Sequence, residues 1–190
     1  MKKLIGMLVL FISFCSQATL ITLTFDKAQY QQGELIQGQL IAHDLNDTLG
    51  GFAGEIAFDH NQLALETWQF GSGFDDGFGS YSFADDSISG RLSLEDYADF
   101  FADEVVIASK QGTSFVLASF TFTAVTLGVH SVSLLNGLEL ISFDNATIES
   151  FSQMSTNFSV VTVDEPHVGL LFALTLVAVF FSRSRRRTLL

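Results

Sequence analysis

Cysteine is almost absent from this chain: the single one, Cys15, lies in an apolar segment at the N-terminus. That segment opens with Lys2 and Lys3, continues as the apolar run 4–14 and ends in the small and polar residues Ser-Gln-Ala at 16–18. This is the pattern of a secretory signal peptide cut by signal peptidase after residue 18. A retained membrane anchor is the alternative. If the segment is cut, the mature protein has no cysteine, so its core must be stabilised by packing without disulfides.

Basic residues are also scarce. Between residues 19 and 163 there are three, Lys27, Arg91 and Lys110, against 19 acidic residues, which gives a formal charge of −16. A domain with this charge repels phosphate backbones, so nucleic acid is excluded as a partner. Such acidity favours solubility and is able to attract divalent cations. About 145 residues suffice for one domain with one core.

The single proline, Pro166, begins the C-terminal segment, in which residues 167–182 carry no formal charge. Proline suits a first helical turn, and 16 apolar residues form a helix of about 24 Å, slightly shorter than a bilayer core of about 30 Å. We predict a transmembrane helix at 167–182, with a buried core helix as the alternative. The arginines that follow predict a cytoplasmic end; they are Arg183, Arg185, Arg186 and Arg187.

This C-terminal segment resembles the PEP-CTERM sorting signal of exported bacterial proteins. The resemblance rests on Val163, Asp164, Glu165 and Pro166 together with the apolar helix and the arginine cluster. It departs from the motif at Asp164, where the family has a first proline. The resemblance implies recognition by an exosortase, a membrane-embedded cysteine transpeptidase, and localisation at the membrane and then at the cell surface or outside the cell.

The body, residues 19–163, is dominated by short runs in which apolar and polar residues alternate with a period of two. Glycines at 71, 73, 77 and 79 mark turns, and only residues 96–106 suggest a helix. The pattern predicts an all-β fold, an antiparallel β-sandwich. The predicted strands cover residues 21–25, 34–42, 52–58, 63–70, 88–95, 115–124, 129–135, 138–143 and 157–163.

A second resemblance is to cohesin domains. It rests on residues 51–63, where a strand ends in Phe58 and Asp59 and a tight turn leads to Leu63, and on residues 114–135, where two strands flank Gly128. His60 stands where the family usually has a proline. The resemblance implies a jelly-roll sandwich of about nine strands, related to carbohydrate-binding modules, that works as a binding or scaffolding module.

Candidate ligand-binding residues are of two kinds. Most of the 15 phenylalanines in residues 19–163 are expected to fill the core, whereas Trp68, Tyr81 and Tyr97 are the aromatics best suited to stack on sugars. Acidic pairs in loops, with the hard oxygen ligands that Ca²⁺ requires, suggest a calcium site. These pairs are Asp75 with Asp76 and Asp85 with Asp86. A solvated acidic surface is the alternative.

Catalysis is not expected. No serine has the nucleophile-elbow pattern, the mature body has no cysteine nucleophile, and the four histidines are scattered. The sequence therefore predicts a non-catalytic exported module that binds exopolysaccharide or another surface protein and has no obligatory cofactor. Two alternatives stay open: direct carbohydrate recognition and a calcium-dependent polysaccharide hydrolase with a carboxylate pair.

Overall fold

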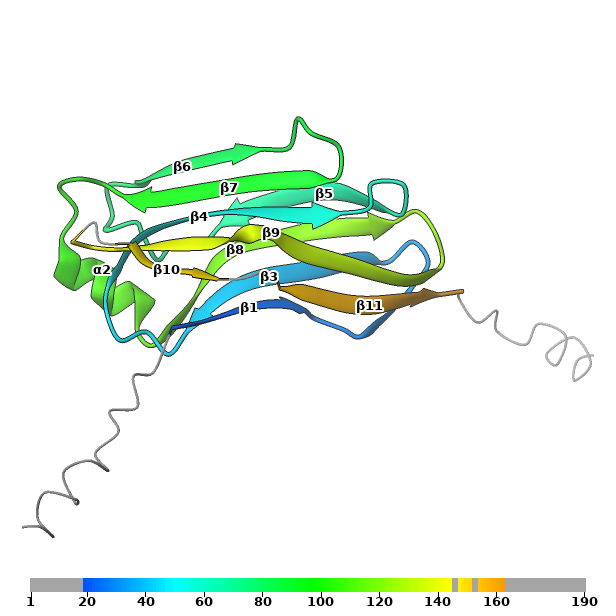
Figure 1. The fold of residues 1–190 in the computed structure, drawn as a ribbon, viewed down its shortest axis with the longest axis horizontal. Coiled ribbons are helices and arrows are strands. Elements are labelled where there is room, and N and C mark those ends of the chain that lie inside the picture. Colours follow the sequence, from blue (N-terminus) through cyan, green and yellow to red (C-terminus); the bar gives the residue numbers. More distant parts are fainter. Residues whose placement is uncertain (1–18, 145–146, 152–153, 163–190) are drawn as a thin grey trace, which may run out of the picture.

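The computed structural model describes residues 19–144, 147–151 and 154–162, which form two β-sheets packed face to face (Figure 1). The predicted signal peptide, the predicted transmembrane helix and the sorting-signal residues from Val163 onward lie outside the described residues. Within the described residues, no helix is long and apolar enough to cross a membrane.

The smaller sheet has four antiparallel strands in the order β1-β3-β8-β5. Their bounds are Leu20–Phe25 for β1, Leu35–His43 for β3, Ser114–Ala124 for β8 and Leu63–Phe70 for β5.

The larger sheet has seven strands: six follow one another in the order β2-β11-β9-β4-β7-β6, and β10 pairs with β9. All its pairs are antiparallel except β2 with β11. The bounds are Gln29–Gln31 for β2, Ser155–Val161 for β11, Gly128–Ser142 for β9, Leu49–Phe58 for β4, Arg91–Ala98 for β7, Ser80–Asp85 for β6 and Thr147–Phe151 for β10.

The predicted antiparallel sandwich is therefore confirmed, with 11 described strands instead of about nine. Strands β2, β6 and β10 were not predicted. The predicted strands 129–135 and 138–143 form one long strand, β9. A β-bulge opposite Gly54 and Glu55 shifts the register there, so the strand passes through the glycine at 137 and its pairing with β4 continues.

The helix prediction for residues 96–106 was wrong in its position. Residues 91–98 continue the alternation as β7, and the helix α2 runs from Glu104 to Gln111. It begins there because the Asp103 side chain accepts a hydrogen bond from the N–H of Val105 and caps the free N-terminal N–H groups.

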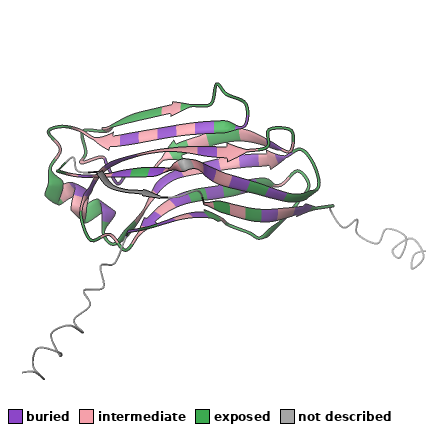
Figure 2. Cartoon of the chain, viewed as in Figure 1, coloured by how far each residue is buried: buried purple, intermediate pink, exposed green. Residues whose placement is uncertain are grey.

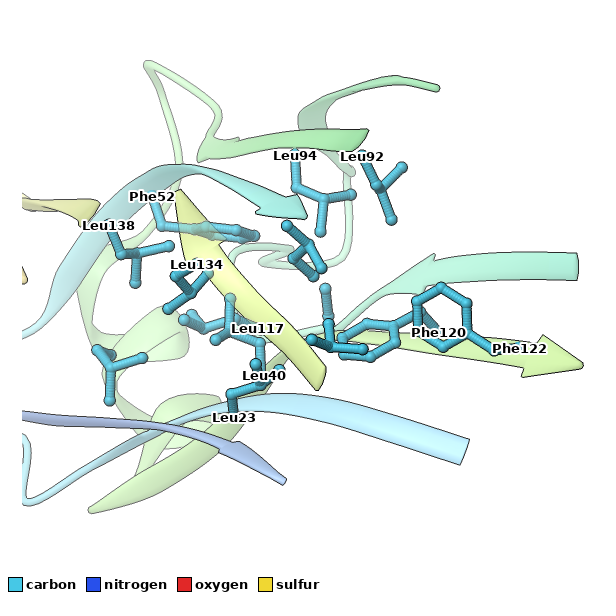
Figure 3. Packing of buried hydrophobic residues seen from close by; sticks show 14 of the residues in the cluster. Leu23, Leu40, Phe52, Leu92, Leu94, Leu117, Phe120, Phe122, Leu134 and Leu138 are labelled. Atoms are coloured by element: carbon cyan, nitrogen blue, oxygen red, sulfur yellow. The ribbon is translucent and has the colours of Figure 1, made fainter. Parts of the chain in front are cut away.

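The core lies between the two sheets and is built from alternate residues of each strand, visible as stripes in Figure 2. Figure 3 shows Leu40 and Leu117 of the four-stranded sheet facing Leu134 and Leu138 of the seven-stranded sheet. Aromatic rings fill much of this space, as the sequence predicted. The largest fully buried aromatic side chains are Tyr30, Phe52, Phe74, Phe120 and Phe122.

Helix α2 lies at one end of the sandwich (Figure 1) and is joined to it by the buried amide of Gln111. The Oε1 atom accepts a hydrogen bond of 2.9 Å from the Leu49 N–H, and Nε2 donates to the carbonyls of Leu49 at 2.8 Å and Gly73 at 3.1 Å. One side chain thus ties the start of β4 to the loop 71–79, which leads into β6.

Candidate functional site

The outer face of β6, β7, β4 and β9 is built from residues that lie opposite one another in adjacent strands. In one row Tyr81 lies opposite Tyr97, Tyr97 opposite Gly51, and Gly51 opposite Ile141. Because paired residues in antiparallel strands point to the same side of the sheet, each row is a line of side chains across the face. The next row consists of Phe83, Glu95, Ala53 and Glu139.

Strand β6 forms the edge of this sheet and has no buried residue (Figure 2). The side chain of Tyr81 is 64% exposed and that of Phe83 is 58% exposed. In the described part of the chain, every exposed large aromatic residue lies on β6, in the loop before β6 or in the loop after β7. We call this set the aromatic edge: Phe78, Tyr81, Phe83, Phe100 and Phe101.

Two loops carry the remaining rings of the aromatic edge and are held together by hydrogen bonds. The Asp76 Oδ2 atom accepts from the N–H of Asp103 at 3.2 Å, which joins the loop before β6 to the loop after β7. Lys110 of α2 donates to the carbonyl of Asp75 in the same region. At the junction, Tyr81 and Phe100 line one shallow pocket of about 210 Å³.

Strand β4 presents mainly small residues to this face, with Glu55 as its large side chain. A Cβ atom at Gly51 would lie 2.3 Å from Cδ1 of Tyr97, so the tyrosine ring lies directly against the glycine backbone. Ala53 and Ala57 continue the same side of β4. The face is therefore aromatic along β6, and the Tyr97 ring of β7 covers β4 at Gly51.

The electrostatic character of this region is acidic. Residues 75–104 contain nine carboxylates and one basic residue, Arg91, whose Nη1 lies 3.1 Å from Oε1 of Glu55. Burial, followed by the negative charges of Glu95 and Glu139, raises the pKa of Tyr97. A hydrogen bond to Asp99 raises the pKa of Tyr81. Both phenols therefore stay protonated and remain hydrogen-bond donors at neutral pH.

The four aspartates predicted to bind calcium lie at the two ends of β6. Asp75 and Asp76 precede the strand and Asp85 and Asp86 end it, and a six-residue strand is roughly 17 Å long. The structure therefore does not bring the four together. Among the described residues, no group of three or more acidic, histidine or cysteine side chains is placed to hold a metal ion.

These aspartates instead order their own loops. Oδ1 of Asp75 accepts the N–H groups of Gly77 and Gly79, both at 2.7 Å, and these bonds lower the pKa of Asp75. Oδ1 of Asp85 accepts the N–H of Ser87 at 2.9 Å, which lowers the pKa of Asp85 in the same way.

Trp68 is separated from the two tyrosines. It lies on β5 of the four-stranded sheet, opposite Phe120, and packs against the core, whereas Tyr81 and Tyr97 are neighbours on the seven-stranded sheet. The three predicted sugar-stacking residues therefore do not form one platform. Trp68 lines a separate pocket of about 350 Å³ on its own sheet.

One notable residue of this region was not singled out from the sequence. Asp96 is fully buried beneath β6. Its Oδ1 accepts a hydrogen bond of 2.9 Å from Ser82 Oγ, and its Oδ2 has no hydrogen-bond partner among the residues that the structure describes. Burial raises its pKa. The available signal was its position, since it continues the inward-facing series of Leu92 and Leu94.

Comparison with known proteins identifies the fold as that of cohesin domains. A type II cohesin module of the adaptor scaffoldin ScaA from Acetivibrio cellulolyticus is 20% identical, with a TM-score of 0.60 over 78% of this chain and 94% of that one. A non-cellulosomal cohesin from the archaeon Archaeoglobus fulgidus is 18% identical, with a TM-score of 0.57 over 80% of this chain and 97% of that one.

A third similar structure is the sixth cohesin of scaffoldin B from Acetivibrio cellulolyticus, solved in complex with a dockerin. It is 12% identical, with a TM-score of 0.57 over 77% of this chain and all of that one. No protein-family model matches the sequence, and no curated protein matches it.

Proposed function

We propose that this chain is an exported, non-catalytic binding module that docks a partner protein on the outer face of β6, β7, β4 and β9. The proposal is supported by the shared fold, since a cohesin of this fold has been solved in complex with a dockerin. The observation that carries it is the aromatic edge, because exposed aromatic rings gathered on one edge are typical of an interaction surface.

The partner's chemistry follows from the same surface. Binding over the aromatic edge would cover its rings with apolar groups of the partner, and the eight carboxylates of residues 75–104 other than the buried Asp96 favour basic groups beside them. The partner is therefore a protein domain that presents an apolar surface bordered by lysine or arginine.

We propose further that the two ends of the chain place this module at the cell surface. Residues 1–18 act as the signal peptide, residues 167–182 anchor the exported chain in the membrane, and an exosortase-like enzyme reads the segment from Val163 to Pro166. This part of the proposal rests on the sequence patterns alone.

The test of docking is a calorimetric titration of residues 19–162 with dockerin domains and with proteins that co-purify from the producing cells. Replacing Tyr81 and Phe83 by serine should weaken binding at least tenfold, since buried aromatic residues of an interface each contribute about 1 kcal/mol or more. Affinity should also fall as the salt concentration rises, because the surface is acidic.

The matched control is the double variant Leu35→Ser with Val125→Ser, which removes two exposed apolar side chains remote from β6. It should bind as the wild type does. A partner that binds the Tyr81 and Phe83 variant with unchanged affinity would contradict the proposed surface.

A further inference from the structure

The outer face of the other sheet has a different character. Strands β3, β8 and β5 line the pocket of about 350 Å³ with amide and hydroxyl side chains, and none of its lining residues is charged. We call this set the amide face: Gln37, Gln39, Thr67, Gln69, Ser119 and Thr121.

The amide face is an ordered array, because its members lie opposite one another in the sheet. Gln39 lies opposite Ser119 and Ser119 opposite Gln69, while Thr121 lies between Gln37 and Thr67 in the next row. With strands about 4.8 Å apart, each row spans roughly 10 Å across three strands, and residues two apart along a strand are separated by about 6.8 Å. The patch is comparable in size to a short oligosaccharide.

The amides of this array are not used by the protein itself. Within the described part of the chain, the side chains of Gln37, Gln39 and Gln69 make no hydrogen bond to protein atoms, and all three are exposed. Each offers two N–H donors and one carbonyl acceptor. Three uncommitted amides in one pocket form a surface suited to a ligand that is rich in both donors and acceptors.

The negative charge of the domain disfavours anionic ligands at this face. The 19 acidic residues in residues 19–163, against three basic ones, repel an anionic polymer. Two carboxylates close to the amide face add to this repulsion: Asp26, which accepts a hydrogen bond from the Gln37 N–H, and Glu66, which precedes Thr67 on β5. An uncharged, hydroxyl-bearing ligand meets no such penalty. Its hydroxyls match the amides and the threonine and serine hydroxyls of the face.

We propose that the amide face binds a neutral polysaccharide, with Gln37, Gln39 and Gln69 as the hydrogen-bonding residues. Trp68 also lines the pocket, but its ring packs against the core, so it supports the floor of the site. This site lies on the opposite sheet from the aromatic edge and is independent of the proposed protein docking.

The test is affinity gel electrophoresis of residues 19–162 in gels containing hydroxyethyl cellulose, xyloglucan or dextran, with alginate as the anionic polymer. We expect retardation by at least one neutral polymer and none by alginate. The triple variant Gln37→Ala, Gln39→Ala, Gln69→Ala should lose at least tenfold in affinity. Because these side chains are exposed and unbonded, the variant should fold as the wild type does.

The matched control is Gln29→Ala with Gln31→Ala, which removes exposed glutamines from β2 of the other sheet and should leave retardation unchanged. Absence of retardation by all three neutral polymers, or equal retardation of the triple variant, would overturn the proposal. Sedimentation completes the test: a wild-type dimer that dissociates in the triple variant would mean that a second copy of the chain occupies the face.

Discussion

The ring of Tyr97 lies against the backbone of Gly51 on the neighbouring strand, so closely that a Cβ atom at residue 51 would be 2.3 Å from Cδ1 of the ring. A Cβ there would also lie 2.9 Å from the carbonyl oxygen of Asp96. The glycine therefore allows the tyrosine ring to pack directly on the backbone of β4, next to Tyr81 on β6.

This contact predicts that Gly51→Ala lifts the Tyr97 ring and destabilises the domain by about 1–3 kcal/mol, the usual cost of overpacking. Urea denaturation measures the loss. In a Tyr97→Ala background the same substitution should cost distinctly less, because the ring is gone. The control variant is Ala53→Ser, a small substitution at the next outward-facing residue of β4 after Gly51. Equal costs of Gly51→Ala in both backgrounds would contradict the contact.

The buried amide of Gln111 should be a main determinant of stability. Gln111→Leu leaves the N–H and carbonyl of Leu49 and the carbonyl of Gly73 without their partner, and we expect a loss of about 2–4 kcal/mol. Ser109→Ala, an exposed change on the same helix, should alter stability by less than about 0.5 kcal/mol. Equal denaturation midpoints for the two variants would argue against this role.

The sequence predicted the architecture well because alternation with a period of two is a direct consequence of strand geometry. Runs such as Ile36, Leu40 and Ala42 on one side of β3 could be placed correctly without any structure. The signal failed where neither side of a strand is buried. Strand β6 has no buried residue, so Tyr81 and Phe83 were not recognised as an exposed edge.

The candidate sites were less predictable because they depend on which strands become neighbours. Trp68 and Tyr81 are only 13 positions apart in sequence, yet they lie on different sheets. Conversely, Gln37, Gln69 and Ser119 are far apart in sequence, and only the pairing of β3 and β5 with β8 brings them to one face. Alternation gives the side of a strand on which a residue lies, but not the strand beside it.

The buried carboxyl of Asp96 predicts a pH dependence of stability with an unusual sign. Burial raises its native pKa above the ordinary value of 3.8, with a smaller contribution from the charge of Asp75, while hydrogen bonds from Ser80, Ser82 and the Tyr97 N–H oppose the shift. As the pH rises above 3.8, the unfolded chain releases this proton before the native state does, so this group lowers stability until the native pKa is passed.

The Asp96→Asn variant removes that group while keeping its shape. The melting temperature of the variant minus that of the wild type should be lowest at about pH 3.5. This difference should rise as the pH increases above 3.8 and then level off. Each kcal/mol of stability corresponds to roughly 2–4 °C in melting temperature. Asp86→Asn, an exposed aspartate, controls for removal of one negative charge. A melting-temperature difference for Asp96→Asn that is flat from pH 3.5 to 7 would show that Asp96 is not held in a raised-pKa state.

The sorting proposal predicts both ends of the mature protein. Intact-mass spectrometry of the protein from its producing cells should find Thr19 as the first residue and no arginine cluster at the C-terminus. A chain that still carries Arg187 would mean that no sorting cleavage occurs. A chain that still begins with Met1 would mean that residues 1–18 are retained as an anchor.

The docking face is tested most directly by photo-crosslinking in the producing cells. A photoreactive phenylalanine analogue is placed at Phe83 on the outer face of the seven-stranded sheet, or at Thr121 on the outer face of the other sheet. We expect a discrete protein adduct from position 83 and none from position 121. Protein adducts from position 121 with none from position 83 would contradict it.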